Sequence, residues 1–206
     1  MRLIINLLAI IGLVALVGVG IGYTKVNGML SEFGVSFSDI KALPSQLDPK
    51  AMDVYKDFFQ KFIKTKDPGD AMVWSFPVDE GLSVDEVKES LTSLATDRNF
   101  LFVGESPFYK QAEAVTGKPY RYVNFMSFCD VRVGIQMADY NNAYTAFMPC
   151  RISIVEDKEG KLWLYSMNLD FMIHGGKELP PELKENAIKV RNTILTIMEN
   201  ASHGEF

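Results

Sequence analysis

The sequence predicts an α+β fold in which an N-terminal transmembrane helix precedes a small antiparallel sheet with helices packed on one face. Three observations support this prediction. An uncharged apolar block occupies residues 3–23, a hairpin signal surrounds Gly160, and helical apolar stripes lie in residues 84–95 and 183–201. The chain therefore divides into a transmembrane signal anchor (1–24), a tether with an amphipathic helix (25–72) and an α+β domain (73–206).

The apolar block, LIINLLAIIGLVALVGVGIGY, has the length of a membrane span. About 20 helical residues cross a hydrocarbon core of roughly 30 Å. A cleaved signal peptide would have an apolar stretch of about 7–15 residues and then a small-x-small cleavage site, so we expect an uncleaved anchor. Arg2 precedes the block and only Lys25 follows it before Glu32, so the positive-inside rule places the N-terminus in the cytoplasm and the domain outside.

Two glycines in the predicted anchor, Gly18 and Gly22, have the Gly-x-x-x-Gly spacing that lets helix backbones approach closely in a membrane. One interpretation is that they mark a helix-packing face. The other is a glycine-rich helix in lipid with no specific neighbour. The first interpretation makes a second membrane helix one of the contacts that we expect.

Residues 25–48 have mixed polarity with scattered Gly, Ser and Pro, which predicts a tether rather than a core element. A helix is predicted over residues 49–66, with Asp48 as its cap and Pro49 in its first turn. Such a helix either packs its apolar face on the domain or a partner subunit, or rests that face on the lipid surface. The apolar residues, which recur at three- and four-residue steps, are Met52, Tyr55, Phe59, Phe62 and Ile63.

Helix and strand signals then follow one another along the domain. The stretch WSFPVDEGL predicts a short strand and turn, and a helix follows because Ser83 and Glu86 have capping-box spacing. FLFVGE has the composition of a buried strand, residues 106–117 frame a short helix, and YRYVNFMSFC alternates as a third strand. Two more strands flank a turn at 157–160 that ends in glycine. The last helix begins near residue 180 and keeps an apolar face for about five turns.

Charge and motif content limit the classes of function. The net charge is −5 and no run of basic residues is interleaved with aromatic residues, which excludes a nucleic-acid binder. The sequence contains no Gly-x-Ser-x-Gly, no glycine-rich phosphate loop and no His-Glu-x-x-His. No catalytic residue is therefore assigned and a non-enzymatic role is favoured. The enzymatic alternative is a Cys150 nucleophile with His174 as its base.

The only two cysteines, Cys129 and Cys150, are the main candidate site residues. In an oxidising compartment such a pair becomes a disulfide, or it stays a close thiol pair, and two separate buried thiols are the alternative. A soft-metal site is a third possibility, because thiolates and thioethers favour cuprous ion. The weak metal candidates are then Cys129, Cys150, Met148 and His174, and no other cofactor is expected.

The stretch from Phe125 to Asp157 resembles the family catalogued as domain of unknown function 302. In it Cys129 ends a strand, a helical segment follows, and FMPCRISIVED leads into a turn with glycine. That family typically shows an apolar strand ending in Cys-Asn-Pro and then Leu-Pro-Cys before a valine-rich strand. Residues 148–150, Met-Pro-Cys, match the second motif, whereas Cys-Asp-Val replaces the first.

This resemblance covers roughly residues 73–198 and implies a small α+β domain, often dimeric, in a family without an established reaction. Some members look like membrane-anchored proteins of bacteria. With the orientation predicted above, the resemblance implies a single-pass protein of the bacterial inner membrane with its C-terminal domain in the periplasm.

Taken with the anchor, these features predict a single-pass, extracytoplasmic, non-catalytic interaction protein or accessory subunit. Its expected partners are membrane lipid and either further copies of itself or a larger membrane complex. The alternative function is a periplasmic thiol-redox or soft-metal domain that uses the two cysteines, with copper as the metal.

Overall fold

The computed structural model describes residues 22–32 and 34–206, which form parts of two compact units, 1–47 and 48–206. Most of the predicted anchor, including Gly18, lies outside these residues. Residues 22–32 are helical, and a Cβ atom placed on Gly22 would meet nothing within 4 Å. Within the described part of the chain, no helix combines the length and the apolar character needed to cross a membrane.

The first unit contains more helix than its mixed composition indicated. Beyond residues 22–32 it forms α2 (Phe37–Ala42) and a 3-10 turn (Leu43–Ser45). A capping box starts α2, because the Ser36 hydroxyl accepts from the Asp39 amide and the Asp39 carboxylate accepts from the Ser36 amide. This local signal was missed when residues 25–48 were interpreted as a tether.

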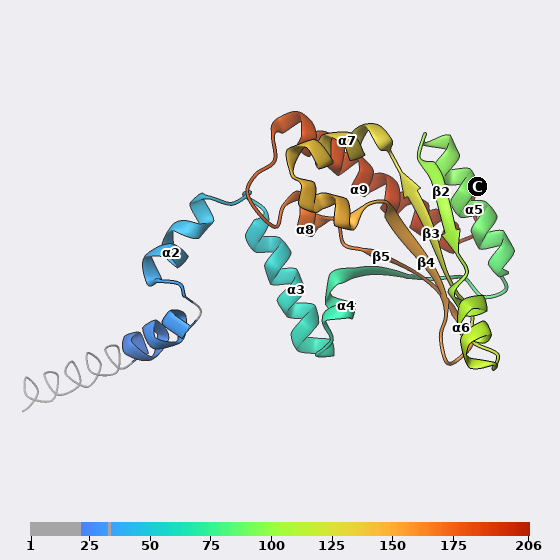
Figure 1. The fold of residues 1–206 in the computed structure, drawn as a ribbon, viewed down its shortest axis with the longest axis horizontal. Coiled ribbons are helices and arrows are strands. Elements are labelled where there is room, and N and C mark those ends of the chain that lie inside the picture. Colours follow the sequence, from blue (N-terminus) through green and yellow to red (C-terminus); the bar gives the residue numbers. More distant parts are fainter. Residues whose placement is uncertain (1–21, 33) are drawn as a thin grey trace, which may run out of the picture. The chain divides into compact units, whose positions relative to one another are not determined.

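The second unit has an α+β fold built on a five-stranded antiparallel sheet with the order β1-β5-β4-β3-β2 (Figure 1). The predicted α+β class with an antiparallel sheet is therefore confirmed. The strands are β1 (Val73–Pro77), β2 (Leu101–Ser106), β3 (Val123–Cys129), β4 (Cys150–Glu156) and β5 (Leu162–Met167). The helices are α3 (Ala51–Thr65), α4 (Pro68–Met72), α5 (Val84–Asp97), α6 (Phe108–Thr116), α7 (Val131–Tyr140), the 3-10 helix η2 (Asn142–Phe147), α8 (Asp170–Ile173) and α9 (Pro181–Ser202).

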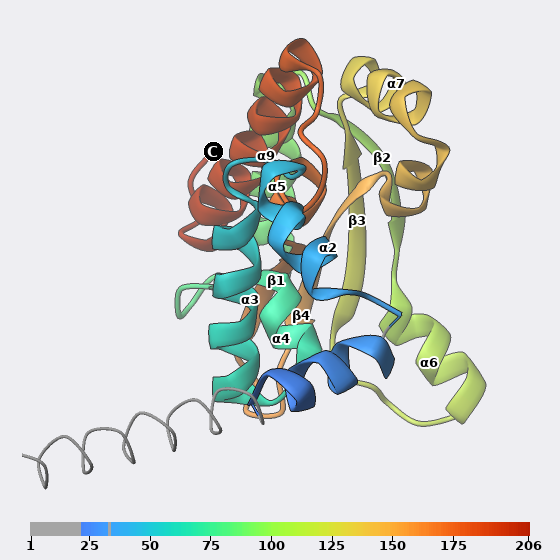
Figure 2. The same ribbon diagram turned by 90° about the vertical axis from the view of Figure 1, so that its left-hand side faces the viewer.

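The core lies between the sheet and two long helices. Successive side chains of a strand alternate between faces, so Met126 of β3 pairs with Ile152 of β4 on the buried face. Leu91 of α5 and Ile194 of α9 belong to the same fully buried cluster. Figure 2 shows α5 and α9 together on one side of β3. The two predicted apolar stripes thus cover the sheet, as their 3.6-residue period requires.

The capping box of α5 is confirmed: the Ser83 side chain accepts from the Glu86 amide, and the Glu86 carboxylate accepts from the Ser83 amide at 2.7 Å. The predicted cap of α3 was wrong, because Lys50 occupies that position and Asp48 turns inward. The strand predicted over residues 120–129 begins only at Val123. Gly160 has φ 82° in the turn that joins β4 to β5, as the hairpin prediction required.

Candidate functional site

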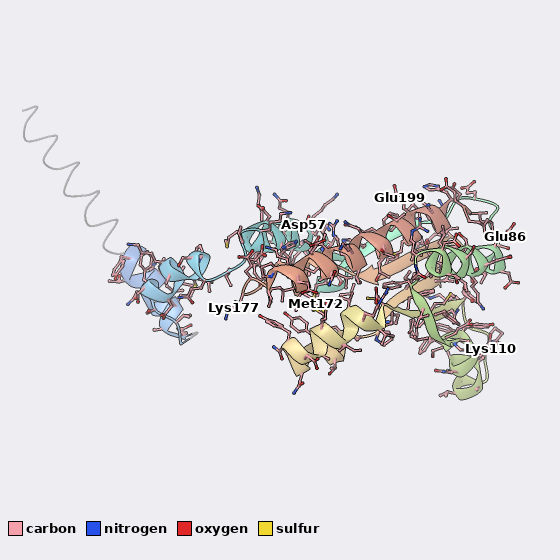
Figure 3. The ribbon with its side chains drawn as sticks, turned by 90° about the horizontal axis from the view of Figure 1, so that it is seen from above. Asp57, Glu86, Lys110, Met172, Lys177 and Glu199 are labelled. Atoms are coloured by element: carbon pink, nitrogen blue, oxygen red, sulfur yellow. The ribbon has the colours of Figure 1, made fainter. Side chains whose placement is uncertain are left out.

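A small cavity of about 60 Å³ lies where β3 ends and β4 begins. The segments around it are α7, η2, α8 and α9, and its walls are almost entirely apolar. Figure 3 shows Met172, which follows Phe171 in α8, close to the α7 segment. Five side chains that line the cavity carry sulfur: Cys129, Met137, Met148, Cys150 and Met172.

The strand register brings the two cysteines together. Phe128 pairs with Cys150 across β3 and β4, so Cys129 is one residue beyond that pair. The segment that connects β3 to β4 contains α7, and Asp130 caps the first turn of this helix. The Asp130 carboxylate accepts from the Arg132 amide at 3.0 Å. The Asp in Cys-Asp-Val therefore starts a helix at the point where the related motif has Asn-Pro.

Both cysteines are free thiols in this structure, so the disulfide that the sequence allowed is not formed here. Burial, assisted by the neighbouring Cys129, raises the pKa of Cys150 to about 12. Burial and then the Asp130 charge raise the pKa of Cys129. Because the thiolate is the nucleophile, these pKa shifts keep both thiols protonated and weakly reactive at neutral pH. These raised pKa values do not favour the thiol-redox or nucleophile interpretations.

Gly134 of α7 faces the sulfur atoms. A Cβ atom built on Gly134 would lie 3.6 Å from Cys129 Sγ and 3.6 Å from Met148 Sδ. A thiol and a thioether therefore converge on one spot of the helix that has no side chain of its own. Within residues 22–32 and 34–206, no group of three or more His, Cys, Asp or Glu side chains is arranged to hold a metal ion. Any metal in this cavity would depend on thioether ligands.

His174, the fourth metal candidate, does not line the sulfur cavity. It is buried beside Asp48, with His174 Nδ1 and Asp48 Oδ1 3.2 Å apart. Lys184 of α9 brings Nζ within 2.5 Å of the other Asp48 oxygen, and the Lys50 amide donates to Oδ1 at 2.8 Å. Burial opposes the charge on Asp48, but the bonds from Lys184, Lys50 and His174 hold its pKa below the usual value. No sequence signal indicated this cluster, because its members are far apart along the chain.

The outer face of α3 is a second candidate site. Ala51 and Val54 are buried against the domain, and the Tyr55 hydroxyl donates to the Gly175 carbonyl at 2.5 Å. Apart from Tyr55, whose hydroxyl makes this contact, the predicted apolar stripe points away from the domain. Its exposed members are Met52, Tyr55, Phe59, Phe62 and Ile63, of which Ile63 is 72% exposed.

Comparison with known proteins places the sheet domain in a family. The sequence model described as "Domain of unknown function DUF302" matches residues 74–201, a range that begins after α3 and α4. The crystal structure of an uncharacterized conserved protein DUF302 from Bacillus stearothermophilus is similar in fold, with 14% sequence identity and a TM-score of 0.51. That match covers 62% of this chain and 95% of the other chain. No curated protein matches. Because the matched range spans more than half of the chain, this protein belongs to the DUF302 family.

Proposed function

We propose that this protein is a single-pass membrane protein whose extracytoplasmic domain associates, without catalysis, with a partner subunit through α3. The uncharged block at residues 3–23 and the position of Arg2 support the anchor and its orientation. They favour the bacterial inner membrane with the domain in the periplasm. The observation that carries the proposed association is the exposed apolar stripe of α3.

The stripe has the composition of an interface core. Aromatic residues and methionine are enriched at the centres of protein interfaces, whereas lysine and aspartate are depleted there. Contiguous apolar surface of this kind marks interaction sites on soluble domains. The exposed side chains that form it are Met52, Tyr55, Phe59, Phe62 and Ile63.

The stripe is also held on a rigid support. Lys184 and His174 bind Asp48 directly before α3, and the Asp48 amide donates to the Gly176 carbonyl at 2.9 Å. Phe58 packs edge-on against Phe171, with ring centroids 5.8 Å apart. A partner would therefore meet a surface that is already ordered, which lowers the entropic cost of association.

A protein partner fits this surface better than lipid. An interfacial helix that binds anionic headgroups has a strongly basic polar face. The polar side of α3 instead carries Asp53 and Asp57 among its lysines, and Lys61 is paired with Asp57 at 2.9 Å. The partner is either a second copy of this chain or a subunit of a larger membrane complex.

Photo-crosslinking in native membranes tests this proposal. A photoreactive residue replaces Ile63 in the full-length chain, and the matched control replaces Val115 of α6, an apolar residue that is 87% exposed. We expect one defined adduct from position 63 and none from position 115. An adduct of twice the chain mass identifies a second copy, and another defined mass identifies a different subunit. Equal labelling at both positions, or no adduct at position 63, would overturn the proposal.

A further inference from the structure

We propose that the cavity between α7 and the paired ends of β3 and β4 is a cuprous-ion site, with Cys129 and Met148 as its principal ligands and Cys150 as a third sulfur. This inference rests on the cavity alone and does not depend on the association through α3. It is based on the sulfur atoms of Cys129 and Met148, which converge on the position at Gly134 where α7 has no side chain.

Sulfur donors and open space lie together in this cavity. Cys129 Sγ and Met148 Sδ lie at the same 3.6 Å distance from the point that a Cβ atom of Gly134 would occupy. Cys150 lines the same cavity, and Cys129 is close enough to Cys150 to help raise its pKa. Met137 and Met172 complete the sulfur lining. The donors come from three separate segments, namely the end of β3, the residues around the start of β4, and the helices beside them.

The donor chemistry selects the metal. Thiolate and thioether sulfur bind cuprous ion well, whereas zinc sites normally use four ligands from cysteine, histidine and carboxylate side chains. Asp130 also lines the cavity, but its carboxylate is engaged by the Arg132 amide at the start of α7. The described part of the chain offers no group of three or more of the side chains that hard or borderline ions require.

The charge balance also suits an apolar cavity. Burial of net charge is costly. One thiolate with one cuprous ion is neutral, while thioethers and a Cys150 thiol that keeps its proton add no charge. On binding, the Cys129 thiol releases its proton to solvent and a sulfur–copper bond forms. The copper stays in the +1 state throughout, so no oxidant or reductant takes part in the step.

Anaerobic titration of the full-length protein with cuprous ion, in competition with a chromophoric Cu(I) chelator, measures this site directly. We expect the wild-type chain to bind one ion. Cys129→Ser should weaken binding by at least about tenfold, since it removes a direct ligand. Met148→Leu should also weaken it while it keeps the packing volume. The matched control is Met126→Leu, because Met126 is buried in the core but does not line the cavity.

Gly134→Ala is the sharpest variant because it alters no sulfur atom. Its Cβ would sit at ordinary contact distance from both sulfurs and would take up space beside them. In a helix interior, alanine is more favourable for stability than glycine. We therefore expect weaker copper binding together with an unchanged or higher melting temperature. A simple loss of folding would lower both quantities.

Two results would overturn the cuprous site. One is a Cys129→Ser, Cys150→Ser double variant that binds cuprous ion as tightly as the wild type. The other is equal affinity in Met148→Leu, Gly134→Ala and Met126→Leu. The second result would mean that the cysteine thiols bind the ion without the Met148 thioether and without the open position at Gly134 of α7.

Discussion

Lys184 of α9 places its ammonium 2.5 Å from the buried carboxylate of Asp48, the residue that leads into α3. Asp48 has a fully buried side chain, and Lys184 also contacts Glu178 at 2.6 Å. His174 approaches the same carboxylate from the turn after α8. This ion cluster joins the start of α3 to the C-terminal part of the fold, so it holds the exposed stripe of α3 in place.

Replacing Asp48 by alanine should destabilise the folded unit by about 3 kcal/mol. The change leaves Lys184 and His174 without their shared acceptor, and removing one member of a buried ion pair is strongly destabilising. Chemical denaturation followed by circular dichroism measures the free energy of unfolding. The control is Glu185→Ala, which removes an exposed pair with Lys189 and should have a much smaller effect on the free energy of unfolding. Equal effects of the two variants would show that the buried cluster is not a major support.

The Asp48 cluster also predicts a dependence of stability on pH. The pKa of Asp48 is lowered in the folded state from its ordinary value of 3.8, so its stabilisation is present above that value. It is lost as the pH falls through the lower folded pKa. The pKa of Lys184 is raised from 10.5 by its bonds to Asp48 and Glu178, so its contribution is lost only as the pH rises above that range.

Unfolding free energies of wild type and Asp48→Asn should therefore converge in acid, over the range of roughly pH 5 to pH 1 in which such carboxylates titrate. The two curves should stay apart near neutral pH. Parallel curves across the whole acid range would contradict the lowered pKa of Asp48.

The capping box of α5 predicts a local effect. Ser83→Ala removes the acceptor of the Glu86 amide and should lower stability by about 1 kcal/mol. Ser93→Ala, in the middle of the same helix, is the matched control and should be neutral or stabilising because alanine has the highest helix propensity. Thermal unfolding of both variants checks the opposite signs. A loss of equal size in both would mean that the cap contributes nothing beyond the serine side chain itself.

Deleting residues 1–24 should release the protein from the membrane. The deleted residues contain the uncharged block that was predicted to span it, whereas residues 48–206 form a compact unit of their own. Alkaline carbonate extraction separates integral from peripheral proteins, and the full-length chain should stay in the membrane pellet. Full-length protein in the supernatant would contradict the anchor. The truncated chain should be soluble and keep the circular dichroism of its folded unit.

Local sequence patterns predicted the elements well where the signals act over a few residues. Ser83 and Glu86 predicted the start of α5, and Gly160 predicted the hairpin between β4 and β5. Interactions of this kind join neighbours three or four residues apart, so they can be recognised without knowledge of the fold. Asp48 shows the limit of this approach. Its position before a helix predicted a cap, but a hydrogen bond to a histidine 126 residues away placed it in a buried cluster.

The sequence by itself determined the types of the main elements, the antiparallel α+β class, the family resemblance and the pairing of cysteine with methionine as candidate ligands. These follow from periodicity and short motifs. Only the tertiary structure decided that Met148 and Cys129 converge on Gly134 while His174 belongs to a separate cluster. It also decided that the stripe of α3, apart from Tyr55, faces away from the domain. These arrangements depend on strand order and helix packing, which bring together residues that no local pattern connects.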